Sequence, residues 1–194
     1  MKRIVAIVFS LLILVSCRRS PLENTISRFQ EKMDEFNNYT CTYTLIVNSK
    51  EKSTSYLIEE RFVKPDYINI RILEPKESQG FTITYEGNKV YIKHPSIEQS
   101  ISIESIKILN RNLSMGNILE NIRVLDESMV EMEEIEGEEY IVLTVGLGEK
   151  NKYRNTQKIW IKKKDFIPHK SNIFDEEGNI YLEIYYQNFQ YDVL

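Results

Sequence analysis

Tyr39-Thr40-Cys41-Thr42-Tyr43-Thr44-Leu45 is a stretch in which apolar or aromatic side chains alternate with threonines. This period of two is typical of a β-strand that is buried on one face. The residues before it follow the different period of an amphipathic helix, with apolar side chains three or four positions apart: Leu22, Ile26, Phe29, Met33 and Phe36. The change of period predicts a helix that leads directly into a sheet.

The boundaries of this helix are marked by polar residues. Ser20 suits the N-cap position, Pro21 suits the first turn, and Glu23 can complete a capping box. The apolar pattern ends at Asn37-Asn38. We expect the apolar stripe to pack on the protein's own sheet, and docking on a membrane or on a partner helix is the alternative.

The period of two continues through most of the remaining chain. Strands are predicted at residues 40–47, 55–63, 67–73, 81–85, 89–93, 129–135, 139–145, 157–163, 169–175 and 179–189. Residues 101–128 instead carry apolar side chains at helix-compatible spacings and predict one or two short helices across a sheet face, with a break at Gly116. The fold class is therefore α+β: about ten antiparallel strands in a strongly curved sheet, an N-terminal helix, and a short helical insert that covers the concave face.

Composition limits the classes of function. The 194 residues are 42% hydrophobic and 28% charged, which is enough apolar material for the core of one domain. A net charge of −4 argues against a nucleic-acid partner, because such a partner requires a basic face. Two cysteines and two histidines are too few for a structural zinc site and leave little for nucleophile and base pairs. We predict no catalytic residue, no metal and no cofactor.

The N-terminus has the pattern of an export signal. Lys2-Arg3 precedes an apolar run over residues 4–15 that is too short for a comfortable membrane-spanning helix. Leu14-Val15-Ser16-Cys17 resembles the lipobox of bacterial lipoproteins, in which the cysteine after the cleavage site receives a diacylglycerol. We therefore expect residues 1–16 to be a lipoprotein signal peptide and residues 17–194 to form a single domain lipidated at Cys17. This would place the protein on the extracytoplasmic face of the cell membrane.

Five short segments follow one another in a characteristic order. They are residues 34–43, residues 62–67, Glu74-Pro75, residues 85–91 and residues 95–99. Together they resemble the LolA/LolB-like superfamily of bacterial lipoprotein carriers. The resemblance implies a single LolA-like domain, an incomplete β-barrel whose apolar concave face is lidded by helices. In the carriers an Arg before a Pro gates the acyl-binding cavity, whereas this chain has Lys64 before Pro65.

A compositional bias narrows the resemblance. Ala6 is the only alanine, and isoleucine, lysine, asparagine and glutamate are abundant, as is typical of AT-rich genomes such as those of clostridia. A LolA-like lipoprotein in that setting is similar to the clostridial germination-specific lipoproteins of spores (GerS-like). The resemblance implies a non-enzymatic protein of the spore or forespore envelope that binds and enables the cortex N-acetylmuramoyl-L-alanine amidase, or a similar secreted hydrolase, in cortex modification and germination. Unpaired edges of a long sheet also permit a homodimer formed by strand exchange.

The alternative function is that of a carrier or acceptor of lipid or lipoprotein acyl chains. By alternation, the side chains expected on the concave face are Tyr43, Leu45, Phe62, Ile70, Ile72, Phe81, Ile83, Val90 and Ile92. In a carrier they would line an acyl pocket, and in a partner protein they would be filled core, which is the interpretation that we favour. A cavity smaller than about 300 Å³ would count against the carrier function.

The remaining polar candidates have structural explanations. His94 and His169 lie beside prolines, without a second histidine or a cysteine nearby. The glutamates of residues 131–139 fit the solvated face of a hairpin, and residues 175–179 fit a hairpin turn better than a calcium loop. Residues 162–164, three lysines beside Trp160, are interpreted as a charged strand end at a sheet edge; contact with an acidic partner or an anionic membrane is the alternative. Cys41 is expected to be a buried free thiol.

Overall fold

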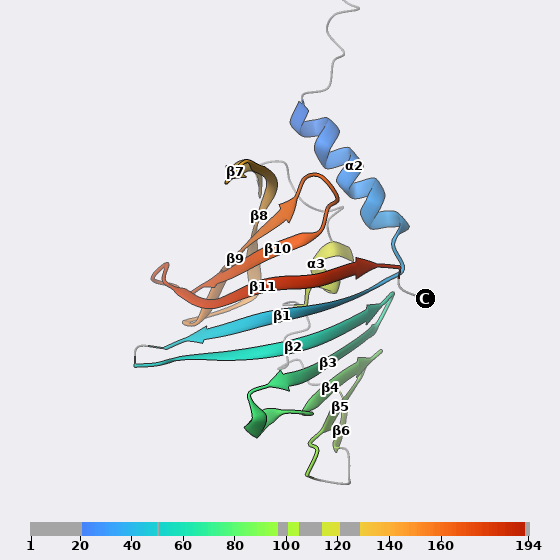
Figure 1. Ribbon diagram of the computed structural model, residues 1–194, viewed down its shortest axis with the longest axis vertical. Coiled ribbons are helices and arrows are strands. Elements are labelled where there is room, and N and C mark those ends of the chain that lie inside the picture. Colours follow the sequence, from blue (N-terminus) through green and yellow to red (C-terminus); the bar gives the residue numbers. More distant parts are fainter. Residues whose placement is uncertain (1–20, 50, 97–100, 105–113, 121–128, 193–194) are drawn as a thin grey trace, which may run out of the picture.

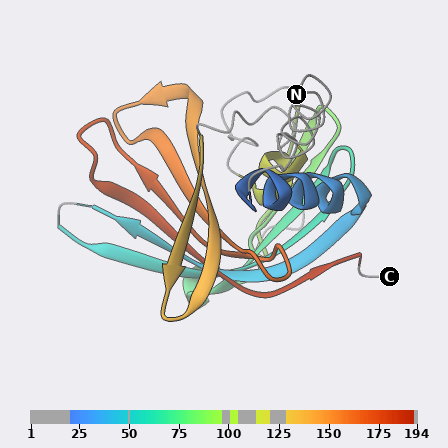
Figure 2. The ribbon, with the colours of Figure 1, turned by 90° about the horizontal axis from the view of Figure 1, so that it is seen from above.

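The computed structural model describes residues 21–49, 51–96, 101–104, 114–120 and 129–192. The expected signal peptide, Cys17 and the Ser20 cap lie outside these residues. One antiparallel sheet bends strongly around two α-helices (Figures 1 and 2). Neither of these helices combines the length and the apolar character that crossing a bilayer requires.

Helix α2 (Pro21–Glu35) has the amphipathic character that the sequence predicts. Phe29 and Met33 on its inner face are each 2% exposed, and Phe36 directly after the helix is fully buried. Leu22 and Ile26 are half-buried against the same core. The apolar stripe therefore packs on the concave side of the protein's own sheet, as expected (Figure 2).

Eleven strands lie in the order β6-β5-β4-β3-β2-β1-β11-β10-β9-β8-β7. Their bounds are β1 (Asn38–Asn48), β2 (Ser53–Val63), β3 (Tyr67–Glu74), β4 (Thr82–Glu86), β5 (Lys89–Lys93), β6 (Ile101–Glu104), β7 (Val130–Ile135), β8 (Glu138–Asn151), β9 (Arg154–Lys162), β10 (Pro168–Phe174) and β11 (Ile180–Tyr191). A short 3₁₀ helix, η1 (Lys76–Ser78), connects β3 to β4. Because β1 pairs with both β2 and β11, the first and last strands meet in the middle of the sheet, and β6 and β7 remain as its edges. The incomplete barrel is thus confirmed.

The middle of the chain differs from the expectation in two ways. Residues 101–104 form strand β6 beside β5 and not a helix, because Ile101 and Ile103 alternate with polar neighbours. Helix α3 (Met115–Glu120) does occur, but Gly116 lies inside it and does not break it. A Cβ at Gly116 would overlap the ring of Phe62, so the glycine permits a close approach of helix and sheet. Residues 105–113 and 121–128 of the expected insert lie outside the described residues.

The concave side of the sheet is filled by side chains from both halves of the chain. Tyr39 of β1 is fully buried and stacks on Phe62 of β2 and on Phe189 of β11, with 5.2 Å and 4.7 Å between ring centroids. Met115 and Leu119 of α3, each 1% exposed, belong to the same core. This packing agrees with the expectation of a filled core, and it leaves the small cavity described next.

Candidate functional site

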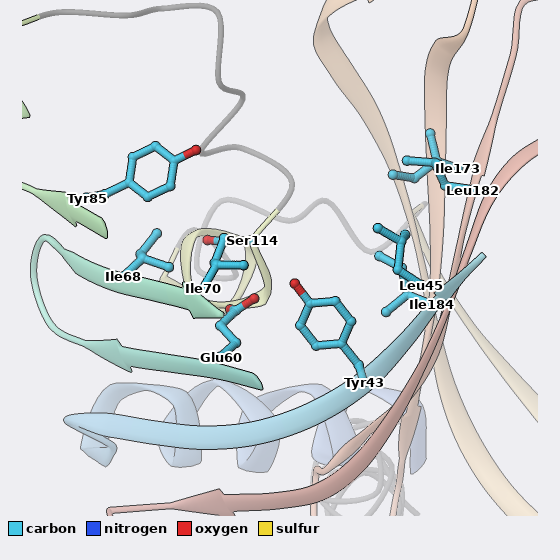
Figure 3. Close-up of a pocket in the computed structure, with 10 residues that line it drawn as sticks. All are labelled: Tyr43, Leu45, Glu60, Ile68, Ile70, Tyr85, Ser114, Ile173, Leu182 and Ile184. Carbon is cyan, nitrogen blue, oxygen red and sulfur yellow. The ribbon is translucent and has the colours of Figure 1, made fainter. Parts of the chain in front are cut away.

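A small cavity lies on the concave side, where β1, β2 and β3 face β10 and β11 (Figure 3). Its volume is about 130 Å³, well below the roughly 300–1,000 Å³ of typical ligand pockets. Most of the lining is apolar, with a few polar groups among it. The lining residues are Tyr43, Leu45, Glu60, Ile68, Ile70, Tyr85, Ser114, Ile173, Leu182 and Ile184.

The nine side chains expected on the concave face are distributed over the cavity and the core around it. Tyr43, Leu45 and Ile70 line the cavity. The surrounding core holds four more, of which two are buried and two are half-buried: Phe62, Val90, Ile83 and Ile92.

The other two expected residues lie at the η1 end of the sheet. Ile72 and Phe81 are half-buried and are joined by a backbone hydrogen bond of 2.9 Å from the N–H of Ile72 to the carbonyl of Phe81. The Phe81 ring lies near His94, with 6.2 Å between ring centroids. Neither residue lines the cavity.

A buried carboxyl group forms the polar end of the cavity. Glu60 is 3% exposed, and the Tyr39 hydroxyl donates a hydrogen bond to its Oε1 at 2.5 Å. The Tyr43 hydroxyl also hydrogen-bonds to Glu60, and Figure 3 shows the two groups pointing toward one another. Burial raises the pKa of Glu60 above its ordinary value, while the hydrogen bonds from the two tyrosines oppose that rise.

Groups around Glu60 are held in their neutral forms. Burial, followed by the nearby Glu60 charge, raises the pKa values of Tyr39, Tyr43 and Tyr186 well above their ordinary range. The same two causes raise the pKa of Cys41, which is 4% exposed. Cys41 is therefore the buried free thiol that the sequence predicts, and its neutral form is a poor nucleophile.

Sequence reasoning missed Glu60, although a signal for it exists. Glu60 lies two positions from both Ile58 and Phe62, so the alternation that places those residues inward places Glu60 inward too. A glutamate is rarely fully buried without a partner, and the partners come from β1. The lining residues on β10 and β11 were also missed. Strand β11 pairs with β1, and β10 pairs with β11, but both strands lie far from β1 in the sequence.

Lys64 connects the end of β2 to helix α2. Its Nζ donates a hydrogen bond of 2.8 Å to the carbonyl of Met33 and lies 3.9 Å from the centroid of the Phe36 ring. The position at which the carriers have a gating Arg therefore holds the C-terminal end of the helix against the sheet.

The two histidines have local partners. His94 Nδ1 accepts a hydrogen bond of 3.1 Å from the backbone N–H of Ser96. His169 packs beside the Tyr140 ring at 5.2 Å between centroids. Burial, and then the charges of Lys162 and Lys170, lower the pKa of His169. Both histidines lie away from the cavity.

The acidic run and the lysine run lie on the outer surface around β7, β8 and β9. Glu133 accepts a hydrogen bond of 2.8 Å from Trp160 Nε1, and Lys163 pairs with Glu139 at 2.8 Å. Strand β9 lies between β8 and β10, so the interpretation of the lysines as blunting a sheet edge was wrong; Lys163 and Lys164 lie in the turn after β9. Residues 175–179 form the expected hairpin turn. The described ranges contain no cluster of three or more side chains suited to hold a metal ion.

Two comparisons with known sequences point to sporulation. A family model described as "Sporulation protein YdcC-like" matches residues 1–193. The sporulation protein YdcC of Bacillus subtilis (strain 168) is 20% identical over 185 residues, which cover 94% of this chain and 54% of that protein. This chain therefore spans about half the length of that relative.

Solved structures share the fold. A chain in the structure of the CwlD amidase from Clostridioides difficile in complex with the GerS lipoprotein matches with a TM-score of 0.55 and 24% identity, covering 90% of this chain and 98% of that chain. An uncharacterized conserved protein from Thermus thermophilus matches with a TM-score of 0.56 and 12% identity over 88% of each chain. This chain therefore has the same fold as a chain of the CwlD–GerS complex.

Proposed function

This chain belongs to the YdcC-like sporulation protein family, and from that premise we propose that it is a non-enzymatic lipoprotein that binds and enables a secreted cell-wall amidase of the spore. Its role would lie in cortex modification and germination. The observation that carries the proposal is the match, over nearly the full length of both chains, to a structure in which a lipoprotein and an amidase form a complex.

The chemistry of the concave side supports binding more than catalysis. Glu60 is enclosed, and its carboxyl group is engaged by Tyr39 and Tyr43. A general acid or base must reach a substrate atom within about 3 Å or through one water. Glu60 faces only a cavity of about 130 Å³, and its two hydrogen bonds to tyrosines of β1 suit it to hold β1 and β2 together.

A carrier of acyl chains is the second candidate, because the cavity is apolar and lies on the concave side. Its volume of about 130 Å³ counts against this function. Native mass spectrometry of the full chain, extracted from membranes in detergent, distinguishes the two. A bound lipid released only on unfolding would support the carrier, and a bare protein mass would support the partner.

We also propose that residues 1–16 are removed and that Cys17 carries the lipid. A tether at the extracytoplasmic membrane face raises the local concentration of a partner at that surface without any new contact. Radiolabelled palmitate should enter the wild-type protein and the Cys41→Ser control but not Cys17→Ser. Equal labelling of the wild type and Cys17→Ser would remove the anchor from the proposal.

The amidase partnership is tested by co-purification. The full chain in detergent should retain the cortex amidase of the same organism at micromolar concentration, and light scattering of the complex should give its stoichiometry, including any homodimer formed by strand exchange. A deletion strain should show a loss of amidase products in the cortex. The absence of a complex, together with normal products in the deletion strain, would overturn the proposal.

A further inference from the structure

A second cavity lies outside the concave core, at the ends of three hairpins. Its volume is about 700 Å³. The ends of β1, of the β8–β9 hairpin and of the β10–β11 hairpin gather on one side of the sheet, at the left in Figure 1. The lining residues are Asn48, Ser49, Lys152, Tyr153, Asp175, Glu176, Glu177, Asn179, Ile180 and Tyr181.

Hydrogen bonds join the walls of this cavity to one another. The backbone N–H of Glu176 donates to the carbonyl of Lys152 at 3.4 Å, which connects two of the hairpin ends. Asn48 Nδ2 donates to the carbonyl of Ile180 at 3.4 Å, which connects β1 to β11. These two bonds connect the residues that line the cavity to one another.

Aromatic side chains form one wall. The rings of Tyr153 and Tyr181 lie 5.2 Å apart between centroids, with 32° between their planes. Tyr153 is 47% exposed, and Ile180 beside the pair is 38% exposed. Both are among the few large apolar or aromatic side chains that are exposed in the described part of the chain. The two rings are tilted toward each other, and Lys152 Nζ lies 4.7 Å from the centroid of the Tyr153 ring. The exposed part of this pair offers contact area to a ligand with an apolar face.

Polar groups form the rest of the lining. The lining includes two asparagine amides, the carboxylates of Glu176 and Glu177 and the ammonium of Lys152. Internal hydrogen bonds hold the two amides in place: Asn179 Nδ2 donates to Asp175 Oδ2 and Glu177 Oε2 at 3.1 Å and 3.2 Å, and Asn48 Nδ2 donates to the Ile180 carbonyl and to Glu183 Oε1. The carboxylates, with several lone pairs each, supply the acceptors for a ligand. Three carboxylates, Asp175 included, outnumber the one ammonium among these residues, which favours neutral or cationic ligands over acidic ones.

We propose that this hairpin-end cavity binds a hydroxyl-rich glycan. A pyranose ring has apolar C–H faces and a polar rim, and the cavity offers an aromatic wall beside hydrogen-bonding groups. A peptide added as a strand would instead need a free sheet edge, whereas none of the lining residues lies on the edge strands β6 and β7 or on β8. The inference goes beyond the proposed function because it requires no amidase.

Isothermal titration of the full chain in detergent tests the proposal with two probes, the tetramer of N-acetylglucosamine and the tetramer of glucosamine. We expect saturable binding of at least one probe, with a Kd of about 1 mM or tighter. Preference for the second probe would identify the carboxylates as the main contacts, and preference for the first would identify the aromatic wall. Tyr153→Ala should weaken binding about tenfold or more, and Tyr153→Phe should retain it.

The matched control is Tyr91→Ala. Tyr91 is half-buried on β5, next to the edge strand β6 and away from the cavity, so this variant should bind as the wild type does. If Tyr153→Ala lowers the thermal midpoint, Glu176→Gln replaces it and should weaken binding of the cationic probe. Failure of both probes to bind at about 10 mM, or equal binding by Tyr153→Ala and the wild type, would overturn the proposal. Because no amidase is present, this result is independent of the test of the partnership.

Discussion

Glu60 is a carboxyl group whose ionisation is coupled to folding. Burial raises its pKa in the folded protein, so the folded protein holds this proton more tightly than the unfolded chain does. The stabilising contribution is therefore complete below the unfolded-chain pKa of about 4.3 and is lost as the pH rises through the folded-state pKa. The free energy of unfolding should fall over this window.

Glu60→Gln removes the titrating group and keeps a hydrogen-bonding side chain for Tyr39 and Tyr43. The variant should lack this fall, so its stability relative to the wild type should improve as the pH rises from about 4 to about 8. Urea unfolding at several pH values measures the difference. Glu59→Gln is the control, because the side chain of Glu59 is 51% exposed; it should keep the wild-type slope. Parallel pH profiles for Glu60→Gln and the wild type would contradict the assignment.

Gly116 is a second residue whose identity follows from one contact. A Cβ there would overlap the Phe62 ring, which is fully buried. Gly116→Ala should therefore destabilise the protein by about 1–3 kcal/mol, as overpacked cores do. Gly146→Ala should be close to neutral, because no atom lies within 4 Å of a Cβ at that position. Thermal unfolding followed by circular dichroism compares the two, and equal midpoints would refute the close approach.

At the scale of elements, helix α2 depends on its inner face for its position. Met33→Ala removes a side chain that is 2% exposed and should cost about 2–5 kcal/mol in the free energy of unfolding. Glu31 lies on the exposed face of the same helix, so Glu31→Ala should change the free energy of unfolding by less than about 0.5 kcal/mol. Urea denaturation measures both. A small effect of Met33→Ala would show that α2 is not held by the concave core.

The periods in the sequence predicted the elements well wherever one pattern ran uninterrupted. Helix α2 and ten of the strands follow from them. Strand β6 did not, because its four residues adjoin a segment with helix-compatible spacings. The role of Gly116 also escaped, since the need for a glycine arises from Phe62, more than fifty residues earlier in the chain.

The site was harder to predict than the elements. Alternation found Tyr43, Leu45 and Ile70 but gave no volume for the space between them. The alternation along β2 places Glu60 on the concave face, yet its burial depends on a hydrogen bond from a tyrosine hydroxyl on another strand. The hairpin-end cavity depends on which turns meet at the ends of the strands, and such non-local pairing leaves little signal in a single sequence.

At the scale of the whole molecule, the pairing of β1 with β11 joins the two halves of the chain. Strands β2 to β6 extend from one side of this pair, and β10 to β7 extend from the other. The core likewise contains Phe62 and Ile68 from the first half together with Ile159 and Phe189 from the second. A sheet built in this way is expected to unfold in one cooperative step, because neither half buries its concave face alone.

The fluorescence of Trp160, the only tryptophan, reports the unfolding of β9 in the second half of the chain. Ile68 is fully buried on β3 in the first half, and Ile68→Ala should remove about 2–5 kcal/mol of stability. In a single cooperative unit, the urea midpoint from Trp160 fluorescence should fall together with the midpoint from far-ultraviolet circular dichroism. Arg71→Ala on the same strand, with a side chain 57% exposed, should leave both midpoints nearly unchanged. A Trp160 transition that stays in place while the circular dichroism signal splits into two steps would show two independently folding halves, because the loss of Ile68 would then not reach β9.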